Sequence, residues 1–150
     1  MWHSAWAYSK DCTHTGFKNY NNDQTTMYNA IVDVAEHVLI NYAGDIEIMI
    51  PSGTTIQNMR TVVGDHLNRD GYHPDLNHGR LTAAITWFKT ITGADLDGIE
   101  TDERLLAVAQ KGADSLKTKG VDVTAEQLLN YCIASAEAAI ENPYKVTQIK

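Results

Sequence analysis

The most reactive set of side chains in the sequence lies in the tetrapeptide Asp70-Gly71-Tyr72-His73, which belongs to a polar loop ahead of a predicted helix. In a D-x-x-H pair the aspartate can accept a hydrogen bond from one imidazole nitrogen and thereby fix the tautomer of the ring. The other nitrogen then faces a nucleophile, as an acyl-transfer triad requires. The same spacing also fits a loop carboxylate that caps the following helix.

Several blocks around this pair occur in an order that resembles a known enzyme superfamily. They are Ala5–Tyr8 (AWAY), Ile50–Asn58 (IPSGTTIQN), Arg69–His73 (RDGYH) and Gly79–Ala84 (GRLTAA). Together they are similar to the C-terminal portion of the SGNH (GDSL-type) hydrolases, and most similar to an uncharacterised bacterial branch. The resemblance covers about residues 2–93.

The resemblance implies a function, a fold and two site residues. In SGNH enzymes the D-x-x-H block supplies the last two members of a Ser-His-Asp triad, so Asp70 would orient the ring and His73 would be the general base. The implied reaction is hydrolysis of a small ester or an acylated carbohydrate by a serine esterase or acetylesterase, without a cofactor. The implied fold is α/β, a three-layer flavodoxin-like sandwich with a parallel sheet.

The nucleophile of that superfamily is not found in this sequence. It is a serine in a G-D-S or G-N-S block, and this block and the oxyanion blocks lie upstream of the matched region. The only serine to consider is Ser52, between a predicted strand and a helix, and a turn or cap role suits it better. We therefore expect a C-terminal portion of an SGNH-type esterase, inactive alone.

Two other functions remain open. A metal-dependent hydrolase could use four side chains of the same region, namely His66, Asp70, His73 and His78. Their spacing lacks the i, i+4 pair of an H-E-x-x-H site. A non-catalytic helical interaction protein on a relic scaffold is the second alternative. A further polar group, Gln57, Asn58 and Arg60, could face a substrate cleft, although a solvated helix face is the simpler interpretation.

The elements that would position these residues follow from the hydrophobic pattern. Alternation over residues 2–8 and an apolar run at 45–50 predict two strands, the second of them buried in a parallel sheet. Helical periodicity predicts a helix from Asp23 or Gln24 to Gly44, one capped by Thr54 or Thr55, and one that ends at Gly93. Beyond it only helices are expected, with caps at Thr101–Glu103 and a capping box at Thr124–Gln127. We expect residues 1–93 to be the hydrolase-like part and 94–150 a helical extension.

Composition limits the partners. The 150 residues carry 12 Lys and Arg against 19 Asp and Glu, a net charge of −7, which argues against nucleic acid as a partner. No apolar stretch predicts a membrane span. Cys12 and Cys132 form no CxxC pair, so their redox state stays open. Localisation is open too: the cytoplasm is the default for this chain, and full-length homologues could be exported. The sequence leaves the oligomeric state unknown.

Overall fold

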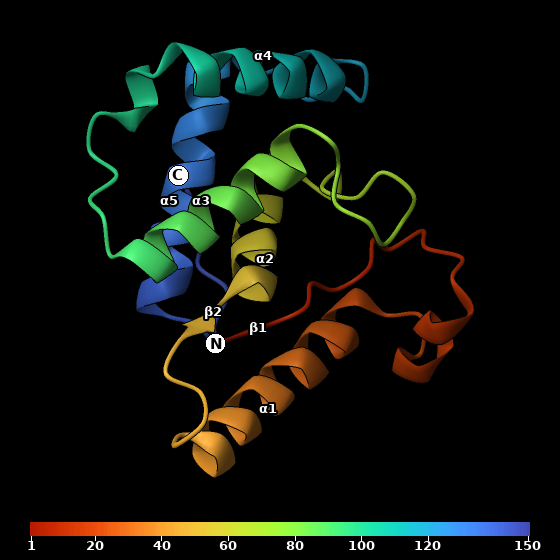
Figure 1. Cartoon of the computed structure of the whole chain (residues 1–150). Helices are drawn as coiled ribbons and strands as arrows, with labels where there is room; N and C mark the ends of the chain where they lie inside the picture. The colour runs from red at the N-terminus through yellow and green to blue at the C-terminus, as the bar shows by residue number, and fades with distance from the viewer.

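Five α-helices, two 3-10 helices and a two-stranded parallel sheet make up the protein, which a computed structural model describes over residues 1–150 (Figure 1). In chain order these elements are β1 (Trp2–His3), η1 (Thr15–Tyr20), α1 (Gln24–Tyr42), β2 (Met49–Ile50), α2 (Ser52–Val63), α3 (His78–Thr92), η2 (Ile99–Thr101), α4 (Glu103–Lys117) and α5 (Ala125–Glu141). The predicted α/β class is confirmed at this coarse level, in a chain that is mostly helical.

The sheet is parallel, as predicted, but much shorter than the sequence pattern suggests. Trp2 pairs with Met49 and His3 with Ile50. The predicted strands at 2–8 and 45–50 are therefore wrong in length, because each contributes only two residues to the ladder. The pairing ends where Pro51, which has no N–H to donate, turns the chain into α2.

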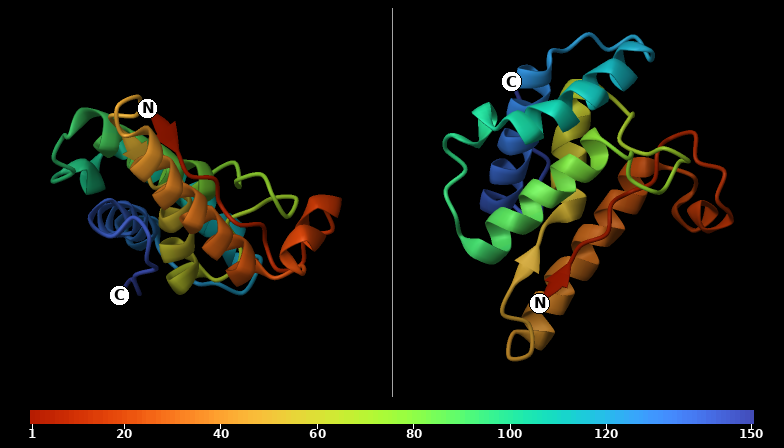
Figure 2. Two further views of the ribbon diagram at one scale, coloured as in Figure 1. Left: turned by 90° about the horizontal axis from the view of Figure 1, so that it is seen from below. Right: turned by 45° about the horizontal axis from the view of Figure 1, so that its top comes forward.

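Helix α1 lies alongside the N-terminal segment, on one side of the helices that follow (Figures 1 and 2). Its start was correctly predicted: Asp23 is the N-cap, and its Oδ1 accepts a hydrogen bond of 2.7 Å from the Thr26 N–H. Met27 and Tyr28 bury the first turns of its apolar face in a small cluster with Ala7, Cys12 and Phe17. The helix thus holds the N-terminal segment in place.

The main core is built by α2, α3, α4 and α5. Fifteen buried residues form it, including Ile56 and Met59 of α2 and Leu128 and Leu129 of α5. Helix α5 packs against α2, α3 and α4, so residues on both sides of position 93 share one core. The free thiols of Cys12 and Cys132 are both buried, and burial raises the pKa of Cys132 to about 12.

Local cap signals were the most accurate predictions in this part of the chain. The capping box of α5 is present, with Gln127 N–H donating to Thr124 Oγ1 at 3.2 Å and Thr124 N–H donating to Gln127 Oε1 at 2.9 Å. Asp102 caps α4. The predicted cap of α2 at Thr54 or Thr55 is wrong, because that helix already begins at Ser52. None of the helices is long and apolar enough to cross a membrane.

Candidate functional site

Asp70 and His73 are in direct contact in the loop between α2 and α3. His73 Nδ1 lies 2.7 Å from Asp70 Oδ2, while Asp70 Oδ1 accepts hydrogen bonds from the backbone N–H groups of His73, at 2.8 Å, and Tyr72, at 3.3 Å. The side chain of His73 is 49% exposed, and its Nε2 makes no hydrogen bond within the chain. The pair therefore has the arrangement in which a carboxylate fixes an imidazole and leaves the second ring nitrogen accessible.

The carboxylate of this pair is held in its ionised form. Hydrogen bonds from the His73 side chain and then from the His73 backbone lower the pKa of Asp70 to about 2. The Arg69 Nε lies 3.9 Å away and adds a weaker favourable contact. Asp70 is thus an acceptor over the whole neutral range, which is what a residue that orients a histidine must be.

The loop that carries the pair is held by the N-terminal segment, a long-range contact that the sequence pattern does not reveal. Trp6 Nε1 donates to the Tyr72 carbonyl at 2.7 Å. The N–H and the hydroxyl of Ser9 donate to the Gly71 carbonyl at 2.8 and 3.1 Å. The residue at 71 has φ of +90°, and a Cβ there would lie 2.9 Å from the sulfur of Cys12. Only glycine combines this backbone conformation with so close an approach.

We predict that Gly71→Ala lowers the free energy of unfolding by about 2 to 4 kcal/mol, because the methyl group adds a clash with Cys12 to the cost of the left-handed backbone. Gly93→Ala is the matched control: Gly93 has φ of +66° and open space around its Cβ position. It should cost only about 1 kcal/mol. Urea unfolding of both variants measures the difference, and equal losses would mean that Cys12 does not constrain the loop.

A second D-x-x-H pair, Asp75 and His78, follows directly in the chain and is buried. His78 is inaccessible to solvent, with Nε2 2.8 Å from the His66 carbonyl oxygen and Nδ1 2.9 Å from Asp75 Oδ1. The Nδ1 contact falls outside hydrogen-bond geometry. The D-x-x-H spacing occurs twice in the sequence, but only the structure shows that the second pair is buried and the first is accessible.

The metal alternative drawn from His66, Asp70, His73 and His78 is wrong in geometry. His73 is engaged with Asp70, whereas His78 is buried against Asp75 and the His66 backbone. No group of three or more His, Cys, Asp or Glu side chains is arranged to hold a metal ion.

The buried pair predicts acid sensitivity. Burial alone would raise the pKa of Asp75, but contact with His78 outweighs it and lowers that pKa from 3.8 to about 2. Because the folded-state pKa is the lower one, the carboxylate stabilises the fold fully above about pH 4 and loses this effect as the pH falls through 2. The stabilisation lost is about 2 kcal/mol.

We therefore expect the destabilisation caused by Asp75→Asn to be about 2 kcal/mol larger at pH 5 than at pH 2. Denaturant unfolding at the two pH values measures this difference. Asp33→Asn, at an exposed position of α1, is the control and should show no such change. A pH-independent effect of Asp75→Asn would contradict the assigned contact.

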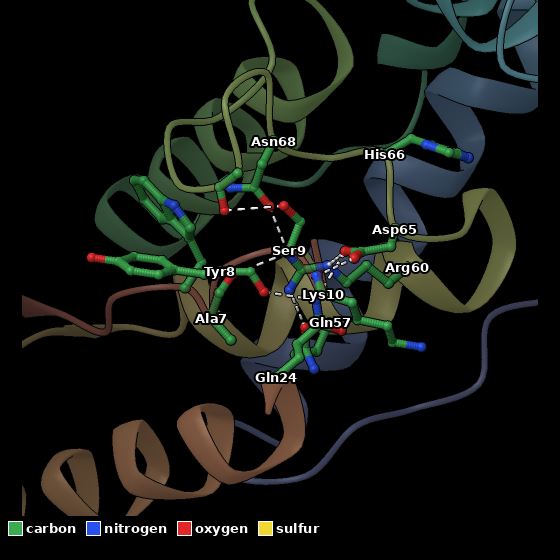
Figure 3. Close-up of polar contacts among 12 residues, drawn as sticks. Ala7, Tyr8, Ser9, Lys10, Gln24, Gln57, Arg60, Asp65, His66 and Asn68 are labelled. Carbon is green, nitrogen blue, oxygen red and sulfur yellow. Dashed lines mark hydrogen bonds and ion pairs between the residues drawn. The ribbon is translucent and has the colours of Figure 1, made fainter. Parts of the chain in front are cut away.

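Arg60 is the centre of a buried polar network that joins α2 to the N-terminal segment (Figure 3). Its guanidinium donates to the Ala7 carbonyl at 3.0 Å, to Asn68 Oδ1 at 2.6 Å and to Gln57 Oε1, and its Nε lies 2.9 Å from Asp65 Oδ1. Burial lowers the pKa of Arg60, and Asp65 opposes that shift. The side chain is 7% exposed, so the predicted solvated helix face is wrong.

The other two members of that predicted polar group are also internal. Asn58 is fully buried; its Nδ2 donates to the Ser135 carbonyl at 3.2 Å and its Oδ1 accepts from the Thr147 N–H at 2.7 Å. Gln57 is half-buried beside Arg60. These residues connect elements within the fold and are not free to bind a substrate.

A polar cavity of about 360 Å³ opens beside Asp70. Its walls contain no hydrophobic residue and are formed by Ser9, Asp11, Thr13, Asp65, His66, Asn68, Arg69, Asp70, Gly71 and Lys119. Both acceptor and donor side chains face it, a lining that suits a hydroxyl-rich ligand. His73 is not among the residues that line this cavity.

No serine of this chain forms a triad with His73. Ser52 is fully buried at the start of α2, where its Oγ accepts a hydrogen bond of 3.1 Å from Trp87 Nε1. Ser9 is the serine bonded to the loop, and its hydroxyl is engaged with the Gly71 carbonyl. Both roles are structural, as the sequence context of Ser52 suggests.

The protein defined so far is a mostly helical α/β chain with an accessible, preformed Asp–His pair. It belongs to the family described as domain of unknown function DUF4886, whose pattern matches residues 1–118. It is similar to a solved DUF4886 family protein from Bacteroides uniformis ATCC 8492, with 39% sequence identity and a TM-score of 0.74. The match covers 98% of this chain and 49% of the other, so this chain spans about half of its relative's length. None of the curated proteins matches the sequence.

Proposed function

We propose that this chain carries the Asp–His half of the catalytic triad of an SGNH-type serine esterase. The observation that carries the proposal is the 2.7 Å contact between His73 Nδ1 and Asp70 Oδ2, with the His73 ring half-exposed. The low pKa of Asp70, about 2, supports the role of an orienting carboxylate. The RDGYH block that contains both residues is one of the blocks in which the sequence resembles that superfamily.

The proposed mechanism is acyl transfer. His73 Nε2 takes the proton of a serine hydroxyl as its oxygen attacks the ester carbonyl, and the same nitrogen then gives that proton to the leaving alcohol. Water, activated by His73 in the same way, releases the acid and restores the serine. Asp70 stays ionised throughout and stabilises the imidazolium that forms.

The serine and the oxyanion donors come, in this proposal, from the part of a DUF4886 domain that this chain does not match. The relative from Bacteroides uniformis is about twice as long as the match, which leaves room for a nucleophile segment. The short parallel sheet would then be part of a larger three-layer α/β/α sandwich. A small ester or an acylated carbohydrate is the proposed substrate, and the polar cavity beside Asp70 supports the second of these.

The test uses this chain together with the segment of the Bacteroides uniformis protein that lies outside the match, co-expressed as a separate polypeptide. The proposal predicts hydrolysis of p-nitrophenyl acetate by the assembled pair and none above the buffer rate by this chain alone. Hydrolysis by this chain alone would contradict the assignment of the nucleophile to the other segment.

A non-catalytic interaction protein is the second candidate. It is favoured by the absence of a serine hydroxyl next to His73 within this chain, since Ser9 and Ser52 are both otherwise engaged. An assembled pair that is folded but inert towards acetate esters would support this function against the first.

A further inference from the structure

Three aromatic side chains, Tyr8, His14 and Tyr72, gather beside His73 and are called here the aromatic cluster. The ring centroid of Tyr72 lies 4.3 Å from that of His73. Within the cluster the centroids of Tyr72 and His14 are 5.1 Å apart, those of Tyr72 and Tyr8 are 5.8 Å apart, and those of Tyr8 and His14 are 5.6 Å apart. The buried ring of Phe17 supports Tyr8 at 5.7 Å. Aromatic surface thus lies directly next to the accessible imidazole.

The polar atoms of the aromatic cluster are left available by the fold. Tyr8 and Tyr72 are partly exposed, and their hydroxyl groups are not among the buried polar atoms that lack a partner, so these groups contact solvent. His14 is exposed, and its Nδ1 accepts a hydrogen bond of 3.2 Å from the Gly16 N–H. Its neutral ring therefore carries the proton on Nε2, which is a donor. The cluster offers ring surface and hydrogen-bonding groups together.

The aromatic cluster borders the polar cavity beside Asp70. Each of its three members is the sequence neighbour of a residue that lines the cavity, namely Ser9, Thr13 and Gly71. The cavity volume, about 360 Å³, is within the range of small-molecule sites. Its walls carry three aspartates against two basic side chains, Arg69 and Lys119, so they hold no excess of positive charge for an anionic ligand. The lining instead suits a neutral ligand rich in hydroxyl groups.

We infer that the aromatic cluster and the polar cavity together bind a neutral sugar chain, with a sugar ring packed on Tyr72 and His14 and its hydroxyl groups bonded in the cavity. The C–H face of a sugar ring is apolar and packs on an aromatic ring, whereas its hydroxyls need polar partners, and both are present here. The place of this sugar in the reaction, as the alcohol part of the ester, rests on the proposed function. Tyr72 and His14 then set specificity, because they hold a part of the substrate that does not react.

The test titrates this chain alone, since sugar binding needs no nucleophile, with three neutral tetrasaccharides: xylotetraose, cellotetraose and maltotetraose. Amide NMR spectra follow the titration, and we expect at least one of these sugars to shift the signals of residues 8–14 and 70–73. Tyr72→Leu and His14→Ala should each weaken that binding about three- to tenfold, because each removes ring surface. Tetragalacturonate, which carries a carboxylate on every unit, should bind more weakly because three aspartates line the cavity.

Tyr42→Leu and His37→Ala are the matched controls, because both remove an exposed ring of α1 far along the chain from the cluster, and both should bind as the unmodified chain does. The amide spectrum of each variant also shows whether it is folded. No shift at residues 8–14 and 70–73 with any of the three sugars at millimolar concentration would overturn the inference. Equal binding by folded Tyr72→Leu and His14→Ala, or tighter binding of tetragalacturonate, would overturn it as well.

The inference and the proposed function fail in different ways. The second measurement uses this chain assembled with the complementary segment, which is the part of the Bacteroides uniformis protein outside the match. Sugar binding by this chain without hydrolysis of p-nitrophenyl acetate by the assembled pair would overturn only the proposed function. Hydrolysis by the pair without sugar binding would overturn only the inference.

Discussion

His73→Ala is expected to lower kcat for ester hydrolysis by the assembled pair by roughly 10⁴- to 10⁶-fold, because it removes the proposed base for the serine proton. The reason is geometric. His73 is the histidine whose Nδ1 contacts an aspartate while the ring stays accessible, whereas the ring of His78 is fully buried. Initial rates with p-nitrophenyl acetate measure the effect.

Asp70→Asn tests the other half of the pair. An amide can offer an N–H to the ring and hold the wrong tautomer, so we expect a loss of about 10⁴ in kcat. The control is His37→Ala, which removes an exposed histidine of α1 that is bonded to Asn41 and should leave the rate unchanged. Equal rates for His73→Ala and His37→Ala would contradict the assigned base.

Arg60→Ala is expected to lower the free energy of unfolding by about 3 to 5 kcal/mol, since it leaves the Asp65 carboxylate without its buried partner. The substitution also removes the donors to the Ala7 carbonyl and Asn68 that tie the N-terminal segment and the loop after α2 to that helix. Urea unfolding followed by circular dichroism measures the change. We also expect Arg60→Ala to make the loop that carries Asp70 more mobile.

Arg104→Ala provides the matched control for Arg60. Arg104 also pairs with an aspartate, at 2.9 Å from Asp102, but its side chain is 90% exposed. An exposed ion pair contributes little to stability, and the Asp102 side chain still caps α4 by accepting hydrogen bonds from the backbone N–H groups of residues 104 and 105. Similar losses in the free energy of unfolding for the two variants would show that burial does not strengthen the contribution of Arg60 to stability.

Local features of the fold and site could be predicted from the sequence because their partners lie within a few residues. The contact between Asp70 and His73 spans three positions, as does the capping box of Thr124 and Gln127. In each case the residue types and their spacing nearly fix the geometry.

Long-range features were missed for a physical reason. Nothing in the spacing tells that Trp6 and Ser9 bind the loop at 71–72, more than sixty positions away. Arg60 was expected in solvent because charged residues are seldom buried, and only the fold brings Asp65 and Asn68 to it. The predicted lengths of the two strands were wrong for a similar reason, since the length of a strand depends on the strand that pairs with it.

The most direct test of the central claim is covalent labelling of the assembled pair with a fluorophosphonate, a reagent that reacts with an activated serine hydroxyl, followed by mass spectrometry of both polypeptides. If His73 is the base for a serine of the complementary segment, one serine of that segment is labelled, and His73→Ala abolishes the adduct while His37→Ala keeps it. An adduct on Ser52 of this chain, or one that survives His73→Ala unchanged, would contradict the account.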